Sequence, residues 1–233
     1  MNNEITAALI ARGAEIVRFV DISDLPRDQT LGLDNAIIFC TPLSREYIQK
    51  MHNTGFRIDY NTDEYLAKER QVEDIADWLA DFIIAKGHRA HSQSSSNNKK
   101  CGYTERAYIN PSMEEGISIL PQKAIAHMAG LGFIGKNNLL VTKAYGCAVA
   151  ICSVLTDAPV ATQSCHIPAP QCGSCNACVK ACPAQALSGS QWTSSGGREA
   201  VLDVSKCCCA LKCMLYCPWT LKYANLPHES ATP

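Results

Sequence analysis

Residues 172–183 read Cys-Gly-Ser-Cys-Asn-Ala-Cys-Val-Lys-Ala-Cys-Pro, with cysteines at positions 172, 175, 178 and 182. This C-x₂-C-x₂-C-x₃-C-P spacing is typical of bacterial proteins that bind [4Fe–4S] clusters, and the fourth cysteine of such a run binds a different cluster from the first three. Three thiolates spaced by two residues can surround one face of a cubane. The fourth lies at the start of a helix, whose first turn suits the fixed φ of Pro183. The run therefore predicts a second group of cysteines elsewhere.

A second group is present towards the C-terminus: Cys207, Cys208, Cys209, Cys213 and Cys217, the last followed by Pro218. Eight of these nine cysteines, four for each cluster, would hold two [4Fe–4S] clusters, and such clusters transfer electrons. A disulfide framework fits less well, because such frameworks belong to small secreted chains and residues 1–4 do not resemble a secretion leader. Structural zinc is the main alternative, although zinc sites usually need two C-x₂-C pairs separated by a dozen or more residues.

The composition limits the other function classes. The chain has 233 residues, 14 cysteines and a formal net charge of −1. This charge argues against a nucleic-acid partner, and the absence of an apolar run of about 20 residues argues against a membrane span. Reduced cysteines and oxygen-sensitive clusters lead us to expect a cytoplasmic protein. Cys40, Cys147 and Cys152 lie in apolar stretches, where we expect them to be small buried residues.

Hydrophobic periodicity predicts a mixed arrangement of helices and strands before the cysteine runs. Buried strands are expected at residues 16–20 and 36–40, and Ser44 is expected to cap a short helix that begins at Arg45. A long amphipathic helix is predicted over residues 62–86, with Gly87 as its stop. The pattern also predicts a strand from residue 88, a polar loop over residues 92–100 and a helix over residues 122–128.

A glycine-rich stretch, Ala129–Asn138, follows the last of these helices. Gly130, Gly132 and Gly135 match G-x-G-x-x-G, but a dinucleotide-binding motif would follow a strand, and a P-loop would need Ser or Thr at Asn137. The simplest interpretation is a turn with an exposed Lys136. Glycines also allow close approach to a ligand, so Gly132, Gly135, Lys136 and Asn137 are candidate residues for binding a cofactor or substrate.

Four motifs in order give the chain a family resemblance: AGLGFIGKNNLL at 129–140, LTDAP at 155–159, the first cysteine run and YCPWT at 216–220. Together they resemble epoxyqueuosine reductase and, more distantly, the corrinoid-dependent reductive dehalogenases. The resemblance implies an α+β protein with a nitroreductase-like α/β domain at residues 1–160, a double-cubane ferredoxin-like module at 161–225 and a tail at 226–233. In that family the α/β domain binds base-off cobalamin, and electrons pass from the clusters to cobalt.

The resemblance also assigns cluster ligands. It implies one cluster held by Cys172, Cys175, Cys178 and Cys217, and a second held by Cys182, Cys207, Cys209 and Cys213. The ligand before Cys213 is Cys208 or Cys209, and we prefer Cys209 because its spacing is shorter. The implied partners are an electron-donor protein of ferredoxin or flavodoxin type and a corrinoid or small-molecule substrate.

The chain departs from the family pattern in two places. The family's proton-donating aspartate would lie at residues 116–120, where the chain has no acid, and Glu114 and Glu115 are the nearest carboxyl groups. No catalytic residue is therefore assigned. The C-terminal helical-repeat region that helps this family bind transfer RNA is not matched, so we expect a short-form relative. The main hypothesis is a reductase that passes electrons to a corrinoid or small molecule. The alternative is a ferredoxin-type electron-transfer protein without substrate chemistry.

Overall fold

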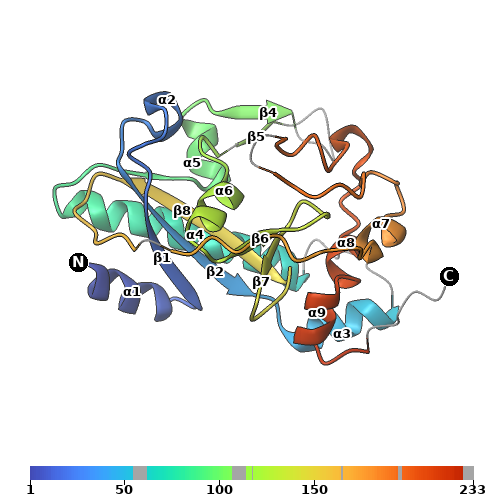
Figure 1. Cartoon of the computed structure of the whole chain (residues 1–233). Helices are drawn as coiled ribbons and strands as arrows, with labels where there is room; N and C mark the ends of the chain where they lie inside the picture. The colour runs from blue at the N-terminus through green and yellow to red at the C-terminus, as the bar shows by residue number, and fades with distance from the viewer. Residues whose placement is uncertain (55–61, 107–113, 117, 164, 194–195, 228–233) are drawn as a thin grey trace. The chain divides into compact units, whose positions relative to one another are not determined.

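The computed structural model describes residues 1–54, 62–106, 114–116, 118–163, 165–193 and 196–227. The chain forms two compact units, each built from segments that are distant in sequence (Figure 1). Unit 1 comprises residues 1–41, 65–131 and 150–166, and unit 2 comprises residues 42–64, 132–149 and 167–233. Most of the predicted cysteine module, from residue 167, thus shares its unit with residues 132–138 of the glycine-rich stretch. The domain boundary between residues 160 and 161 stays a prediction.

The mixed helix and strand content confirms the coarse fold class. In unit 1 the helices are α1 (Asn2–Ile10), α2 (Arg27–Thr30), α4 (Glu64–Ala85), α5 (Ser95–Lys100) and α6 (Gln122–Met128). A four-stranded sheet has the order β1 (Ile16–Asp21), β2 (Asn35–Pro42), β8 (Val149–Thr156) and β3 (Ala90–Ser92). β1 pairs antiparallel with β2, and β3 pairs antiparallel with β8. A separate antiparallel pair joins β4 (Thr104–Arg106) to β5 (Glu114–Gly116).

The core of unit 1 lies between α4 and this sheet. The predicted apolar stripe of α4 is buried at Val72, Ile75, Leu79 and Ile83, and it packs with Ile37 and Phe39 of β2. Each fully buried aliphatic or aromatic side chain stabilises the fold by about 1.5–3 kcal/mol. Figure 1 shows that the long helix α4 runs along the strands of the sheet. An amphipathic helix in this position can bury its single apolar stripe against them.

One predicted element of unit 1 is wrong. Residues 92–100 were expected to form a polar loop, but α5 occupies Ser95–Lys100. Ser94 caps this helix, since its Oγ accepts the N–H of Asn97 at 3.1 Å. The carboxylate of Asp77 on α4 accepts the hydroxyls of Ser92 and Ser94, both at 2.6 Å. These contacts fix a helix whose sequence has no apolar periodicity. The predicted strand at residue 88 begins at Ala90.

Unit 2 consists of short elements. They are α3 (Arg45–Thr54), β6 (Gly132–Ile134), β7 (Leu140–Thr142), α7 (Ala177–Ala181), the 3₁₀ turn η1 (Val204–Lys206), α8 (Lys212–Leu215) and α9 (Pro218–Tyr223). Ser44 caps α3 as predicted, with its Oγ 3.1 Å from the backbone nitrogen of Tyr47. Figure 1 shows α3 beside α9, and Gln49 Nε2 donates to the carbonyl of Ala224 at 2.7 Å.

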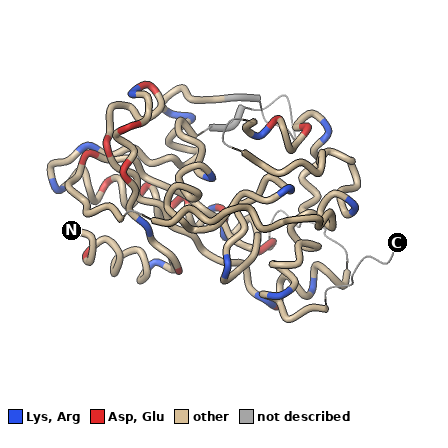
Figure 2. Tube along the Cα trace, viewed as in Figure 1, with Lys and Arg blue, Asp and Glu red and all other residues tan. Residues whose placement is uncertain are grey.

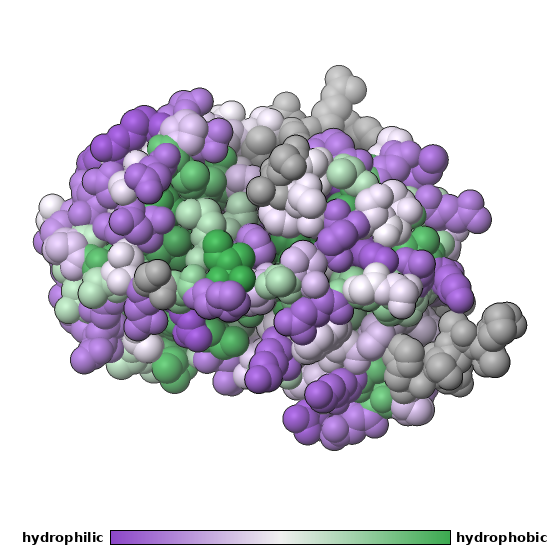
Figure 3. Space-filling view, viewed as in Figure 1, coloured by the Kyte–Doolittle hydropathy of each residue, from purple (hydrophilic) through white to green (hydrophobic). Residues whose placement is uncertain are grey.

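Hydrophilic side chains cover much of the visible surface, with apolar atoms between them (Figure 3). Within the described part of the chain, no helix combines the length and apolar character needed to cross a membrane.

The first testable prediction concerns Glu69 on α4. Burial is the main cause that raises the pKa of Glu69 from 4.5 to about 7, and the negative charge of Glu73 adds to it. A hydrogen bond with Tyr65 has a smaller, opposite effect. The folded protein then keeps a proton that the unfolded chain has lost between these two pH values, so stability falls as the pH rises from 4.5 to 7. Glu69→Gln should raise the free energy of unfolding at pH 8 by up to roughly 3 kcal/mol and flatten this pH dependence.

Urea unfolding at pH 5 and pH 8 measures the effect. Asp24→Asn, at an exposed carboxyl group, is the control and should leave the pH dependence unchanged. If Glu69→Gln and the wild type lose the same stability between pH 5 and pH 8, Glu69 is not the group responsible.

Candidate metal centre

The structure brings Cys172, Cys175, Cys178 and Cys217 together, and we call these residues the first cysteine group. Cys178 lies in α7 and Cys217 directly precedes α9. Cys172 and Cys175 lie in a tight turn, closed by the N–H of Cys175 and the carbonyl of Cys172 at 2.9 Å. Burial is the main cause that raises the pKa of Cys178 to about 11. Negative charge on the sulfurs of Cys217, Cys172 and Cys175 adds to this effect. These mutual effects show that the four sulfurs are neighbours.

A second cysteine group gathers around Cys213 and is predicted to comprise Cys182, Cys207, Cys209 and Cys213. Burial, followed by charge at Cys178, Cys182 and Cys207, raises the pKa of Cys213 to about 12. Because Cys178 belongs to the first group, the two groups adjoin through Cys178 and Cys213. Short distances between clusters favour electron transfer, and this is the arrangement that crossed C-x₂-C-x₂-C-x₃-C-P runs produce.

The choice between Cys208 and Cys209 remains a prediction. Cys208 is exposed and Cys209 is half-buried. The backbone of Cys209 has φ +49°, as does Leu211, so two left-handed residues fold this segment tightly just before α8. Within the described residues, no three His, Cys, Asp or Glu side chains converge on the position of one metal ion. In a cubane each cysteine binds a different iron atom, so its ligands need not converge on one point.

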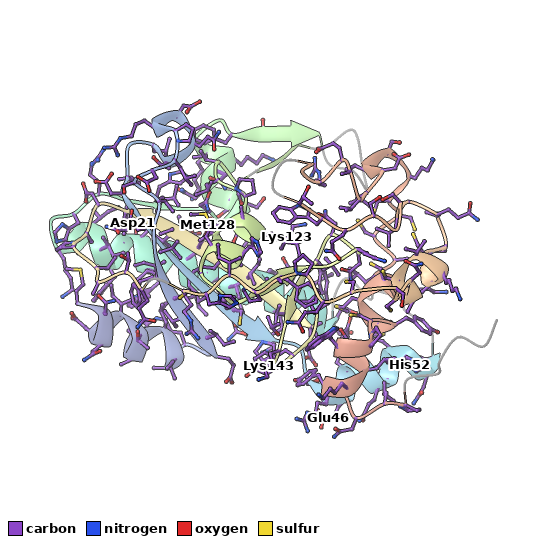
Figure 4. All side chains as sticks on the ribbon, viewed as in Figure 1. Asp21, Glu46, His52, Lys123, Met128 and Lys143 are labelled. Carbon is purple, nitrogen blue, oxygen red and sulfur yellow. The ribbon has the colours of Figure 1, made fainter. Side chains whose placement is uncertain are left out.

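The glycine-rich stretch forms a hairpin rather than only a turn. β6 pairs antiparallel with β7, with Gly132 opposite Thr142 and Ile134 opposite Leu140. A side chain at Gly132 would overlap the carbonyl of Val141. Lys123 and Met128 mark the two ends of the preceding helix α6 in Figure 4. The glycine motif is therefore needed for close packing of two backbones.

The expectation of an exposed Lys136 is wrong. Lys136 is only 8% exposed, and its Nζ donates to Asn176 Oδ1 at 3.2 Å. The backbone N–H of Lys136 also donates a hydrogen bond to Cys172, which lowers the pKa of that thiol. Burial has the larger, opposite effect, so the pKa of Cys172 is raised overall. Tertiary contacts with the loop of the first cysteine group cover this lysine. Its removal should therefore cost more than a surface substitution, on the order of 1–3 kcal/mol.

Asn137 connects the hairpin to the second cysteine group and to Cys147. Its side chain is 5% exposed, and Oδ1 accepts the N–H of Leu139 at 3.2 Å. Nδ2 then faces the carbonyl of Cys213 at 3.1 Å and Cys147 Sγ at 3.3 Å. Of the four candidate residues, Lys136 and Asn137 thus contact the cysteine loops of unit 2, whereas Gly132 and Gly135 pack within the hairpin. The binding of a cofactor or substrate by these four residues stays a prediction.

Sequence reasoning missed two residues near Cys217. Cys147 is buried as predicted, at 4% exposed, but it also contacts Asn137 and Cys217. Thr220 accepts the N–H of Cys147 at 3.0 Å through Oγ1. The Cys147 hydrogen bond lowers the pKa of Cys217 to about 7 against the effect of burial, and Trp219 and Thr220 add further hydrogen bonds in the same direction. The only sequence signal was the small Gly146 beside Cys147.

Structural comparison shows which solved proteins share the fold. The fold is shared with reductive dehalogenases and epoxyqueuosine reductases. A catabolic reductive dehalogenase in complex with 3-bromo-4-hydroxybenzoic acid has a TM-score of 0.69 at 18% identity, over 95% of this chain and 32% of that one. An epoxyqueuosine reductase with an epoxyqueuosine-modified tRNA stem loop has a TM-score of 0.55 at 16% identity, over 100% and 70%.

Sequence comparison points to the epoxyqueuosine reductases in particular. The epoxyqueuosine reductase of Lactococcus garvieae is 43% identical over 169 residues, which cover 59% of this chain and 46% of that protein. The chain thus matches less than half the length of this curated relative. No family model matches the chain. The predicted resemblance is confirmed by these relatives.

The expectation that a nucleic-acid partner is unlikely stays a prediction, although one protein of this fold has been solved with a tRNA stem loop. Net charge sums over the whole chain and does not describe its local distribution. Figure 2 shows Lys and Arg spaced along the segments of both units.

The second testable prediction concerns the close approach at Gly146. Gly146 has φ +57°, and a side chain there would overlap the backbone of Trp219 and Thr220. Gly32 has φ +66°, but a methyl group added there would meet no atom within 4 Å. Gly32→Ala should therefore cost only the left-handed strain of about 1–2 kcal/mol. Gly146→Ala should cost an additional 1–3 kcal/mol, roughly the penalty of overpacking.

Anaerobic urea unfolding of the two variants measures the difference. Equal losses of stability would mean that the Cys147 segment and α9 are not held in close contact.

Proposed function

We propose that the chain is an iron–sulfur reductase whose two [4Fe–4S] clusters deliver electrons to a corrinoid or small-molecule substrate. The observation that carries this proposal is the meeting of the two cysteine groups at Cys178 and Cys213. The relatives support a reductase, since those found by sequence are named epoxyqueuosine reductase. The proposal includes the nitroreductase-like character of unit 1 and the ferredoxin-like character of the cysteine module.

The residues of unit 2 fit such a centre. When bound, the clusters would supply one-electron transfer. The first and second cysteine groups would bind iron through thiolates. Burial is the largest cause that raises the pKa of Cys178 and Cys213, and a bound metal would lower both by compensating the thiolate charge. The rings of Phe133 and Trp219 pack edge to face with their centroids 5.8 Å apart, and Trp219, two residues after Cys217, would shield the cluster from water. Lower local polarity tunes the potential of a cluster. An electron-donor protein of ferredoxin or flavodoxin type would supply the electrons.

The substrate belongs to one of two classes. A corrinoid or small molecule follows from the family resemblance. A transfer RNA that carries epoxyqueuosine is the second class, and it is supported by the similar structure with a tRNA stem loop. The competing function is electron transfer without substrate chemistry. It is supported by the stretch 116–120, which lacks an acid at the position of the family's proton donor.

The third testable prediction is the cluster content. After anaerobic reconstitution the protein should contain close to eight iron atoms and eight acid-labile sulfides per chain, because its eight predicted ligands make two cubanes. Cys208→Ala should keep this content, whereas Cys209→Ala should lose about half of it. Iron and sulfide analysis measures both.

Two outcomes would contradict the third prediction. Four iron atoms in the wild type, or zinc without sulfide, would refute the two-cluster centre. Loss of iron in Cys208→Ala but not in Cys209→Ala would mean that Cys208, and not Cys209, is the ligand.

The fourth testable prediction separates a reductase from an electron carrier. Cob(II)alamin added to the reconstituted protein should show the base-off spectrum, because the family's cofactor domain displaces the lower ligand. The matched control is the same titration with the urea-unfolded protein, which should leave the spectrum of free cobalamin. A base-on spectrum at saturating protein would favour the electron carrier.

A further inference from the structure

The short helix α8 links the two cysteine groups. Cys213 of the second group lies in α8, and Cys217 of the first group lies one helical turn further along the chain. Between them, the side chains of Met214 and Leu215 are buried, so this side of the helix faces the interior of unit 2. A single turn of backbone therefore reaches both predicted clusters.

Another face of the same turn reaches the surface. Lys212 directly precedes Cys213, and its side chain is half-buried. Tyr216 directly precedes Cys217 and is 40% exposed. The backbone N–H of Tyr216 donates to the carbonyl of Lys212 at 2.9 Å. Because they are four residues apart in helical register, Lys212 and Tyr216 lie on one face of the helix.

His52 of α3 completes this exposed face, and Figure 4 shows where it lies on that helix. Its imidazole packs against the ring of Tyr216, with the two centroids 5.1 Å apart. We call Lys212, Tyr216 and His52 the α8 face. Tyrosines of this kind, exposed but held by a neighbouring ring, are enriched where proteins bind one another.

The helices around the α8 face are basic. α8 contacts α3, α7 and α9 (Figure 1). Together these four helices carry one acid, Glu46, and five basic residues: Arg45, Lys50, Lys180, Lys212 and Lys222. In the described part of the chain, none of the four lysines forms an ion pair. The whole chain has a net charge of −1, so positive charge is concentrated locally beside the cysteine groups.

We propose that the α8 face is the docking site of an acidic electron-donor protein, which Lys212 and the surrounding lysines attract and against which Tyr216 packs. This inference rests on the proposed function, since it needs the clusters as electron acceptors. One electron passes from the reduced donor to one oxidised cluster, so the donor is oxidised as the cluster is reduced, and no bond or proton is transferred.

The lysines alone would also attract RNA, but the position of the α8 face favours a redox partner. A protein docked here contacts the residues that directly precede Cys213 and Cys217. Closeness to the clusters matters for electron transfer and has no value for holding a nucleic acid. Complementary charge would speed the encounter of the two proteins and fix their orientation.

The test mixes the reconstituted protein with a fully reduced acidic flavodoxin in an anaerobic stopped-flow experiment. The appearance of the flavodoxin semiquinone gives the rate of electron transfer. Lys212→Glu combined with Lys222→Glu should slow this reaction by at least about tenfold at low ionic strength, and high salt should remove the difference, because salt screens exposed charges. The control reverses two exposed charges of unit 1, Arg70→Glu with Lys100→Glu, and should slow the reaction by no more than about twofold.

A second reductant separates docking from damage to the clusters. Photoreduced 5-deazariboflavin is small and uncharged, so it needs no docking site and should reduce the variant with Lys212→Glu and Lys222→Glu as fast as the wild type. This variant should also keep eight iron atoms per chain. Lys212→Gln with Lys222→Gln removes the charges without reversing them and should react with flavodoxin at an intermediate rate.

Each contrary result has a separate meaning. Equal flavodoxin rates in the wild type and the charge-reversed variant, or no transfer from flavodoxin to a wild type that deazariboflavin reduces, would overturn the inference and leave the proposed function standing. Slower reduction by deazariboflavin would overturn it by placing the effect in the clusters. An unchanged flavodoxin rate with weaker binding of a tRNA stem loop would assign the α8 face to nucleic acid instead. A wild type that binds no cluster would overturn the proposed function itself.

Discussion

The organisation of unit 2 depends on a group of thiols held close together below the surface. Burial and the nearby charges of Cys217, Cys172 and Cys175 oppose the ionisation of Cys178. Burial also opposes the ionisation of Cys213, together with the charges of Cys178, Cys182 and Cys207. Charge that is removed from water must be compensated, and a metal centre is the usual compensation for clustered thiolates. Without it, the fold would gather groups that repel one another when ionised. This arrangement supports the proposed iron–sulfur centre.

The hairpin of β6 and β7 gives this site its rigid support. Lys136 and Asn137 turn their polar groups towards Asn176, Cys147 and the carbonyl of Cys213, so that the hairpin and the cysteine loops constrain one another. Interactions around the ligands orient them and tune the metal. This is a different use of a glycine-rich segment from phosphate binding. Here Gly132 allows the backbone of β6 to pack on the backbone of Val141 in β7.

Much of unit 1 could be predicted from sequence because its elements have clear periodicity. The stripe from Val72 to Ile83 predicted α4, and the apolar run at 36–40 predicted β2. α5 could not be predicted in this way. Its residues are polar, and its stability comes from the Ser94 cap and from Asp77, which lies 17 residues before Ser94 on another helix. A local pattern cannot report a partner at such a separation.

The cysteine spacing predicted the class of centre, and the ordered motifs determined the family resemblance, because both are properties of short segments. Tertiary structure alone decided the rest. It buried Lys136 against the loop at Asn176, and it placed Cys147 beside Cys217, which is 70 positions further along the chain. These contacts join segments whose separation in sequence carries no local signal. Their physical basis is the close approach of backbones and the pairing of buried polar groups, which exist only once the chain has folded.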